Sequence, residues 1–592
     1  MNYEKNDYFK ILKTWCDTLI KLQMKEPQSP AIYGGIFCPA CGRIHGRIND
    51  CMYPLIYLYK KTGDKKYYEA AKGVYCWTKH NTHRPGGFFL NDPNCLWFAT
   101  TVFFNIQLGE LLYHCKDVIC PIELEEWNAS YCETLDFIYK NFNENLSCNI
   151  NYRIAAAAAM AVAWAVKGEE KYKQRARELA LYAINHIGED GLIFGETQGL
   201  DSYGITPRGC RGVDLGYNVE ESLPNLAVYL KYIGEDRTVE QALLRSMDAH
   251  LSFMLPDGAW DNSWGSRSAK WTYYGSRTSD GCQGAYAYLS DRNALYAEAA
   301  HRNFLLYKKS THNGLLTGGP HYADARLPTC IHHTFCHAKS LIPLIESKMK
   351  RDKDLLLPRE TSKGMKTFSS VNVTLAAKGH FKASFSCYDF NALNASTTPT
   401  GGALTMLWND KAGVILAASI NEYDLVENLN MQVPPYFNDI CQTPRLELKR
   451  GKEVFRNTLD TTANITASED KTTLVYNAQG VLKNFLLRGT ERFQITYKLG
   501  DSIFEICAAT TAEDAVYILP LIARNTEALT VCGPAAQLKR ENAVITITCS
   551  QPITHDTSIG KRIFHPCGGF LSAHLRVPIP KNQQVTLKIK VQ

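Results

Sequence analysis

Residues 84–115 read RPGGFFLNDPNCLWFATTVFFNIQLGELLYHC, a glycine-containing polar loop followed by an apolar segment. Apolar residues recur at three- and four-residue spacing from Trp97 to His114, which is the period of an α-helix. Three further loops of this kind occur later in the chain: EDGLIFGETQG (189–199), PDGAWDNSWG (256–265) and HNGLLTGGPHY (312–322). The sequence therefore predicts a repeat whose unit is a polar loop and a helical hairpin.

The predicted helices alternate between an apolar and a more polar type. The apolar helices are expected at 50–61, 97–114, 153–167 and 222–233, and the polar-faced helices at 65–80, 123–141, 170–186, 237–255 and 292–308. A single hairpin cannot bury its apolar face, so the units must stack on one another. Stacking of about six hairpins predicts a closed (α/α)6 toroid, in which the polar loops surround one cavity.

The hydrophobic period changes from helical to alternating near residues 350–365. The later half contains short runs of β-branched and aromatic residues such as FKASFSCYDF (381–390), ALTMLWND (403–410), FQITYKL (493–499) and QVTLKIKV (584–591). We therefore expect an α+β multidomain chain with a toroid over 1–350, a linker over 351–365 and an antiparallel β-sandwich over 366–592.

Composition excludes several classes of function. The formal charge is +6 over 592 residues and no basic run is present, which argues against nucleic acid and membrane surfaces as partners. No run of 18 apolar residues and no signal peptide is recognisable, so the chain as written is expected in the cytoplasm, or in the periplasm or outside the cell if a leader was removed. The 20 scattered cysteines are typical of reduced thiols.

The polar loops carry residues suited to binding a sugar. Sugar rings stack on aromatic side chains, their hydroxyls need fixed polar partners, and guanidinium groups bind planar anions such as carboxylates. The predicted substrate-binding residues are His45, Arg47, Asp92, Trp97, Asn218, Trp260, Trp264, Trp271, Arg277, His321 and His332. The stretch 257–281 is the densest in such residues, although an aromatic glycine loop can also plug the end of a toroid.

Six residues in the same loops are candidates for the chemistry: Glu220, Glu221, Asp261, Tyr273, Tyr274 and His333. Adjacent helical residues point about 100° apart, so one of Glu220 and Glu221 at most should face the cavity. The alternative is that neither glutamate takes part in the reaction and both only stabilise the positive end of a helix. His333 and His337 share a helical face without the glutamate of a HExxH motif.

The segment CPACGRIH (38–45) has a Cys-x2-Cys spacing with a histidine nearby, which is typical of zinc sites. A second cysteine pair at zinc-finger spacing is missing, so we predict no metal, with Cys38, Cys41 and His45 as weak candidate ligands and packed free thiols as the alternative. Nucleotide-binding and acyl-hydrolase motifs are absent from the sequence, and no cofactor is expected.

A toroid followed by a β-sandwich resembles the heparinase II/III-like polysaccharide lyases, and a glycoside hydrolase family of exo-β-glucuronidases built on the same scaffold. The stretch DGAW…WTYYGSR (257–277) resembles the DGSF…Y-G-x-Y-G stretch of the toroid lyases, in which a tyrosine acts as acid and base. Asp261 and Asn262 stand where those lyases have Gln-His. The resemblance implies an enzyme that cleaves oligo- or polysaccharides containing uronic acid.

Two reactions remain open on these residues. Hydrolysis needs a carboxylic acid and a second carboxylate, which Glu220 or Glu221 could form with Asp257, Asp261 or Asp280. The acidic residues favour this reaction, so we expect an exo-acting hydrolase of the β-glucuronidase type. The alternative is a polysaccharide lyase, in which Asn218 or Arg277 neutralises the uronate and Tyr273, Tyr274, His332 or His333 removes the proton from C5 of the sugar.

A sugar epimerase or isomerase, or a carbohydrate-binding protein, is the second alternative. A binding module would need neither the carboxylate pair nor the tyrosine and histidine groups. The β-strand half is available either to cover the cavity or to form a homodimer.

Overall fold

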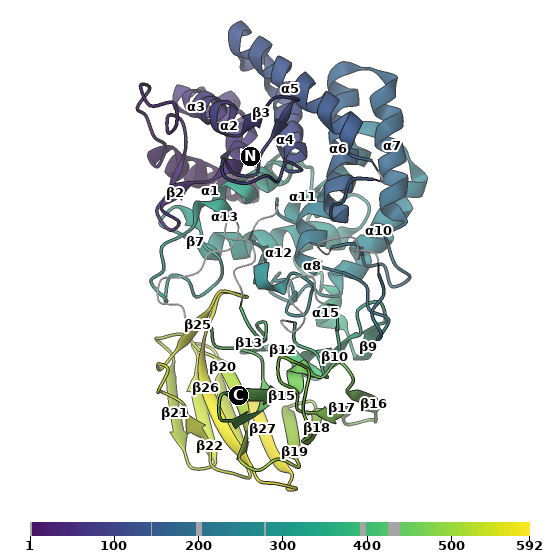
Figure 1. Ribbon diagram of the computed structural model, residues 1–592, viewed down its shortest axis with the longest axis vertical. Coiled ribbons are helices and arrows are strands. Elements are labelled where there is room, and N and C mark those ends of the chain that lie inside the picture. Colours follow the sequence, from purple (N-terminus) through teal and green to yellow (C-terminus); the bar gives the residue numbers. More distant parts are fainter. Residues whose placement is uncertain (1–2, 144, 197–203, 278–279, 391–397, 424–438) are drawn as a thin grey trace.

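The computed structural model describes residues 3–143, 145–196, 204–277, 280–390, 398–423 and 439–592. A helical half is followed by a half made of antiparallel strands, as predicted (Figure 1). In the described residues the fold is a helical toroid followed by an antiparallel β-sandwich domain, which agrees with the sequence-based expectation.

Helices of the first half pair into hairpins in chain order, and the first helix pairs with the last. The paired helices are α2 (Met52–Thr62) with α3 (Lys65–Asn81), α4 (Thr101–Cys115) with α5 (Pro121–Asn141), α6 (Ile150–Lys167) with α7 (Glu170–Ile184), α9 (Leu223–Ile233) with α10 (Arg237–Leu251), α11 (Gln283–Tyr288) with α12 (Ala294–Ser310), and α13 (Ile331–His337) and α14 (Leu341–Glu346) with α1 (Tyr3–Lys21). Contacts of α1 with α13 and α14 close the ring.

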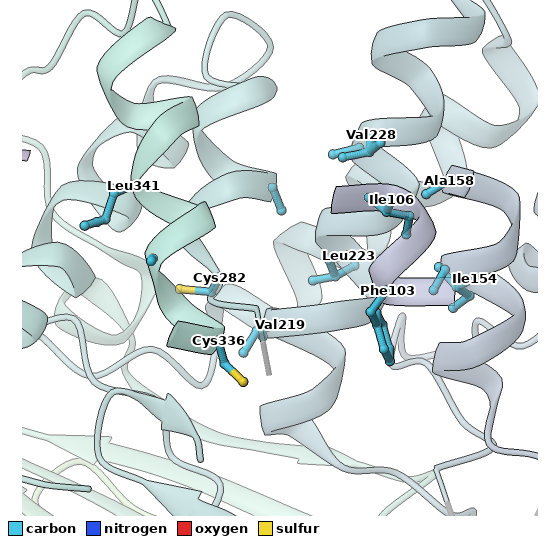
Figure 2. Close-up of a cluster of buried hydrophobic side chains, with 14 of the residues drawn as sticks. Phe103, Ile106, Ile154, Ala158, Val219, Leu223, Val228, Cys282, Cys336 and Leu341 are labelled. Atoms are coloured by element: carbon cyan, nitrogen blue, oxygen red, sulfur yellow. The ribbon is translucent and has the colours of Figure 1, made fainter. Parts of the chain in front are cut away.

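The inner helices form the core of the toroid. Residues Ala155–Ala163 of α6 are completely buried, because their small side chains allow α4 and α9 to pack closely on both sides. Figure 2 shows apolar side chains from inner elements that include α4, α6, α9 and α13, among them Phe103, Ile154 and Cys336. This packing fixes the inner helix ends, from which the polar loops emerge.

One inner helix is irregular at the residues of chemical interest. Asp214 caps α8 (Leu215–Tyr217) by accepting a hydrogen bond from the backbone N–H of Tyr217. The helix then continues through a π-helical turn, η4 (Asn218–Ser222), into α9. Such π turns occur frequently at functional sites, and this one changes the angular offset expected between Glu220 and Glu221.

Short hairpins and 3-10 turns lie in the connections of the helical half. The hairpins are β1 (Phe37–Cys38) with β2 (Arg43–Ile44), β3 (His83–Arg84) with β4 (Phe88–Phe89), β5 (Trp271–Thr272) with β6 (Gly275–Ser276), and β7 (Thr311–His312) with β8 (Leu315–Leu316). The 3-10 turns are η1 (Gly46–Cys51), η2 (Lys116–Val118), η5 (Ser268–Lys270) and η6 (Ala338–Ser340).

The described strands of the second half form three antiparallel sheets. The first has the order β13 (Gly413–Ala417), β12 (Ala403–Asn409), β11 (Phe381–Ser386), β10 (Val373–Lys378) and β9 (Gly364–Phe368). The second has the order β15 (Glu453–Arg456), β14 (Arg445–Arg450), β20 (Ala515–Ile522), β26 (Phe570–Ile579) and β24 (Thr554–His555), with β25 (Ile563–His565) paired to β26. The turn η7 (Asn457–Leu459) follows β15.

The third sheet is the largest and continues the same core. Its order is β16 (Asn464–Glu469), β17 (Leu474–Val481), β18 (Arg492–Leu499), β19 (Ile503–Thr510), β27 (Val585–Val591), β23 (Val544–Cys549), β22 (Ala535–Lys539) and β21 (Ala528–Cys532). Aromatic residues of different strands stack in the core, with Phe385 parallel to Tyr476 at a centroid distance of 4.2 Å. The strand predictions at 381–390, 403–410, 493–499 and 584–591 are confirmed.

The two halves touch on the side of the toroid where the polar loops emerge. The backbone N–H of Gly568 donates to Trp271 O at 2.9 Å, and that of His321 donates to Gly569 O at 3.0 Å. The short helix α15 (Pro358–Thr361) joins the halves, and its buried Arg359 donates to Ala383 O. Residues of both halves therefore surround the loops. Among the residues that the structure describes, no helix is long and apolar enough to span a bilayer.

Candidate active site

Two cations, Lys270 and Arg277, flank the hairpin β5–β6. Trp271 pairs with Ser276, and the N–H of Arg277 donates to Lys270 O at 3.1 Å. Both cationic side chains are almost completely buried. Lys270 contacts Tyr217 and Arg277 contacts Tyr423, so each cation is held by a phenol.

Tyr217 lies between two cations of this stretch. Lys270 Nζ donates a hydrogen bond to Tyr217 Oη at 3.2 Å, and the guanidinium of Arg267 stacks over the Tyr217 ring at 4.2 Å from its centroid. Positive charges next to a phenol oxygen stabilise negative charge that develops on it. These two cations can therefore stabilise a phenolate form of Tyr217.

Arg277 joins the toroid to the strand half. Its Nη1 donates to Tyr423 Oη at 2.8 Å, and Tyr423 belongs to the segment that follows β13. Burial raises the pKa of Tyr322, and the Arg277 guanidinium opposes that shift. Burial, with Arg277 nearby, also holds the pKa of His333 well below its ordinary value, so this imidazole is neutral at neutral pH. Arg277 thus stands among groups that can bind an anion and accept a proton.

Glu220 contacts the last helical unit. Its Oε2 lies 3.3 Å from His337 Nε2, and both side chains are completely buried. Burial raises the pKa of Glu220, and His337 opposes this shift. A Cβ at Gly275, whose φ is +155°, would collide with Glu220 Oε1, so the glycine of the Tyr274-Gly275 pair is required by this close approach.

Glu221 turns instead toward the third helical unit, so the two glutamates diverge. Its Oε2 accepts a hydrogen bond from Asn151 Nδ2, while the Asn151 backbone N–H donates to Glu196 Oε1 at 3.0 Å. Burial and the neighbouring Asp280 raise the pKa of Glu221 to about 8. Burial also raises the pKa of Glu196 to about 8, although Arg267 lies 3.5 Å from its Oε2 and opposes the shift.

Arg47 and its partners form a second buried group of charges at the first and last units. Arg47 Nη2 lies 2.7 Å from Asp50 Oδ2 and 3.7 Å from Asp280 Oδ1, and Lys339 Nζ lies 3.3 Å from Asp280 Oδ2. Burial raises the pKa of Asp50 to about 6 against the opposing charge of Arg47. These contacts tie η1 to the end of the ring.

Tyr274 and His333 lie together, whereas Tyr273 faces the strand half. Tyr274 Oη donates to Thr317 O at 3.0 Å and lies 3.5 Å from His333 Nδ1. The Tyr273 ring packs edge-on against Phe570 at 5.0 Å. The Tyr274 phenol therefore donates its hydrogen bond to a backbone carbonyl, whereas the Tyr217 phenol accepts a hydrogen bond from a lysine.

The tryptophans of 257–281 are packed in the core. Trp260, Trp264 and Trp271 are at most 1% exposed. The indole N–H of Trp260 donates to Cys282 Sγ at 3.2 Å, and that of Trp271 donates to Trp260 O at 2.8 Å. Trp97, by contrast, is half-buried, and its indole N–H donates to Tyr152 Oη at 2.8 Å. Of the four tryptophans predicted to bind substrate, Trp97 is therefore the one whose ring is exposed enough to contact a sugar.

Five further predicted residues make contacts of their own. Asn218 donates to Ile193 O at 2.9 Å, and Asp92 accepts from the Asn94 N–H of its own turn at 3.3 Å. Asp261 accepts from Ser263 Oγ at 2.6 Å and from Ser384 of the strand half. His321 Nδ1 accepts from the Leu571 N–H at 3.0 Å. His332 packs edge-on against His45 at 5.4 Å.

The sequences of known proteins decide the family. Residues 12–360 match the family model described as the ulvan lyase N-terminal domain, and residues 365–592 match the ulvan lyase C-terminal domain. The chain belongs to the ulvan lyase family. It is 35% identical over 581 residues to a protein of Formosa agariphila named broad-specificity ulvan lyase. The alignment covers 95% of this chain and 90% of that protein.

Solved structures show the same fold at much lower identity. Heparinase III has a TM-score of 0.55 and 13% identity, with 100% of this chain and 92% of that chain covered. The chondroitin AC lyase of Streptomyces coelicolor A3 also has a TM-score of 0.55, with 11% identity and coverage of 100% of this chain and 80% of that chain. The predicted resemblance to the heparinase II/III-like lyases is therefore confirmed.

Membership of the ulvan lyase family shows that the expectation of a β-glucuronidase-type glycoside hydrolase is wrong. The matched domains and the relative from Formosa agariphila indicate a polysaccharide lyase. In the structure Glu220 contacts His337 and Glu221 contacts Asn151, while two of the proposed partners, Asp261 and Asp280, are bonded to serines and to cations of the protein.

Sequence reasoning missed several residues of the site: Glu196, Arg267, Lys270 and Tyr423. Tyr423 gave no signal, because it lies far away in the chain and approaches Arg277 only when the halves pack together.

Glu196 should make stability depend on pH. Its pKa is raised from 4.5 to about 8, so the unfolded chain loses this proton first and native stability falls as the pH rises from 4.5 to 8. Each pH unit corresponds to about 1.4 kcal/mol at most. Glu196→Gln should melt like the parent at pH 5 and several degrees higher at pH 8.5, in scanning calorimetry. Exposed Glu178→Gln is the control. If Glu196→Gln and the parent differ in melting temperature by the same amount at both pH values, the raised pKa of Glu196 is contradicted.

Trp97 and Trp264 should respond differently to replacement by alanine. Trp97→Ala is expected to raise KM about two- to twelve-fold with little change in melting temperature, because an aromatic contact is worth ~0.5–1.5 kcal/mol. Trp264→Ala removes a fully buried ring and should cost about 3–5 kcal/mol of stability. Steady-state kinetics and thermal melts measure both. An unchanged KM for Trp97→Ala would remove Trp97 from the sugar site.

Proposed function

We propose that this chain is a polysaccharide lyase that cleaves ulvan, a sulfated polysaccharide containing uronic acid, by β-elimination. The observation that carries the proposal is the 35% identity to a broad-specificity ulvan lyase along almost the whole chain. The buried cations Lys270 and Arg277 on either side of the β5–β6 hairpin support it, because a uronate substrate requires fixed positive charge.

Arg277 is the group proposed to neutralise the uronate carboxylate. Its guanidinium is buried and held by Tyr423, so a planar anion can be bound in a fixed orientation. Neutralising the carboxylate makes the C5 proton more acidic, since the negative charge that develops at C5 spreads onto the carboxyl group. The predicted alternative, Asn218, instead donates to Ile193 O and lies 3.1 Å from His250 Nε2.

Tyr217 is the group proposed to transfer protons. The C5–H bond breaks, its electron pair forms the C4=C5 double bond, the C4–O bond breaks, and the bridging oxygen takes up a proton. Arg267 and Lys270 stabilise the phenolate when the tyrosine gives its proton away. His333 is the second group able to accept a proton, because it is neutral and close to Arg277.

The test is incubation of the purified protein with ulvan while ultraviolet absorbance is followed. A C4=C5 double bond conjugated to the carboxyl group absorbs there, and a saturated product does not. We expect the absorbance to rise with ulvan and to stay flat with carboxyl-reduced ulvan, which cannot undergo the elimination. Chain shortening without new absorbance would contradict the proposal.

A further inference from the structure

A group of sulfur and nitrogen atoms lies between the first and last units of the toroid. Within the described ranges, the ligand atoms of Cys38, Cys41, His45 and Cys330 all lie within 4.8 Å of one another. Cys38, His45 and Cys330 are buried, and Cys41 is half-buried. The sequence brings the first three together, but Cys330 joins them only through closure of the ring.

The hairpin β1–β2 holds the Cys-x2-Cys pair in a tight turn. Cys38 pairs with Arg43, and the Gly42 N–H donates to Cys38 O at 2.9 Å. Gly42 has a φ of +63°, a left-handed conformation that glycine adopts without strain. The turn therefore directs both sulfurs to one point, and Cys330 approaches that point as the N-cap of α13.

The distances fit a tetrahedral metal centre. Cys330 Sγ lies 3.8 Å from Cys38 Sγ, 3.5 Å from Cys41 Sγ and 3.5 Å from His45 Nε2. Zinc–sulfur bonds of about 2.3 Å place two sulfurs of a tetrahedron roughly 3.8 Å apart. A disulfide would require about 2.05 Å between the sulfurs. The spacing is thus that of ligands around a shared ion.

We propose that Cys38, Cys41, His45 and Cys330 bind one structural Zn²⁺ ion. Three thiolates and one imidazole form a closed ligand set that leaves no position for a substrate or water, as in structural zinc sites. Zinc is favoured over magnesium and calcium because thiolates and imidazole are ligands that zinc prefers. The site is independent of the proposed lyase chemistry.

The ion would close the ring beside the active site. His45 directly precedes η1, which carries Arg47, and Cys330 directly precedes α13, which carries His333 and His337. A bond network that joins Cys38 to Cys330 restrains a very long loop in the unfolded chain and fixes the relative position of the two ends of the toroid. Zinc therefore acts as a positioning and stabilising ion.

The first experiment measures metal in the unmodified, tag-free chain by atomic spectrometry and native mass spectrometry. We expect about one zinc per chain, released when an organomercurial blocks the thiols. Exchange into Co²⁺ should give the sulfur-to-cobalt charge-transfer band and intense visible bands of tetrahedral cobalt. These readouts do not depend on activity or on the folding of a variant.

The second experiment compares Cys330→Ser with Cys115→Ser. Cys115 is also buried in the toroid but lies outside the group, so its variant should keep the zinc. Cys330→Ser should bind about a tenth as much zinc or less and melt at lower temperature. Two results would overturn the proposal: a parent chain with no bound zinc and free, alkylatable thiols at 38, 41 and 330, or a disulfide between Cys330 and either hairpin cysteine.

Discussion

Tyr217→Phe is expected to lower turnover by about two to four orders of magnitude, which is the range for loss of a positioned acid or base. The change removes only the phenol oxygen that Lys270 contacts, and the ring can remain under Arg267. Because packing is kept, the melting temperature should change little. Steady-state kinetics on ulvan and a thermal melt measure the two effects.

Three other Phe variants show whether the effect is specific to Tyr217. Tyr75 is a buried phenol bonded to Ser130 on the outer layer, so Tyr75→Phe should retain activity. Tyr274→Phe and Tyr273→Phe should lose less than Tyr217→Phe, since the Tyr274 phenol is held by Thr317 O and the Tyr273 ring packs on Phe570. If Tyr274→Phe is inactive and Tyr217→Phe is nearly normal, Tyr274 is the proton-transfer residue and the assignment of Tyr217 is wrong.

Arg277→Met should lower kcat/KM by about two to three orders of magnitude, the effect of removing one fixed group that stabilises charge in the transition state. Most of the loss should be in kcat, because the carboxylate carries more negative charge in the transition state than in the bound substrate. Arg277→Lys should recover only part of the activity, since lysine keeps the charge but loses the planar fork.

The control for Arg277 is Arg175→Met, which removes a guanidinium from the outer helix α7 and should leave kinetics unchanged. Tyr423→Phe removes the acceptor of the Arg277 hydrogen bond while keeping the guanidinium. It should have an intermediate effect. A loss of activity in Arg277→Met that is matched by a loss of folded protein in circular dichroism would make Arg277 a structural residue.

Much of the fold could be predicted because it follows from local periodicity. The apolar stretch 153–167 becomes α6, and the alternating stretch 493–499 becomes β18, with bounds shifted by at most a few residues. The segment 222–233 becomes the regular helix α9 (Leu223–Ile233), but the π turn η4 (Asn218–Ser222) that leads into it was not predicted. Sequence periodicity does not distinguish one π turn from a regular turn of an α-helix.

The site could be predicted only in part, because its residues are selected by contacts between distant segments. The sequence offers Glu220 or Glu221 as one member of a carboxylate pair, but it does not show that His337 and Asn151 bind these two glutamates. The three tryptophans of 257–281 lie in a polar stretch, yet their surroundings bury them completely. Arg277 was predicted as a carboxylate-binding residue and stays a proposal that Tyr423 supports.

The most direct test of elimination is the mass balance of one cleavage. A size-defined ulvan oligosaccharide is digested with the purified chain, and both fragments are weighed by mass spectrometry. Elimination adds no water, so the two fragment masses should sum to the mass of the oligosaccharide, with the fragment carrying the uronate lighter by one water than its saturated form. Fragments that sum to the substrate plus one water would show hydrolysis and contradict the account.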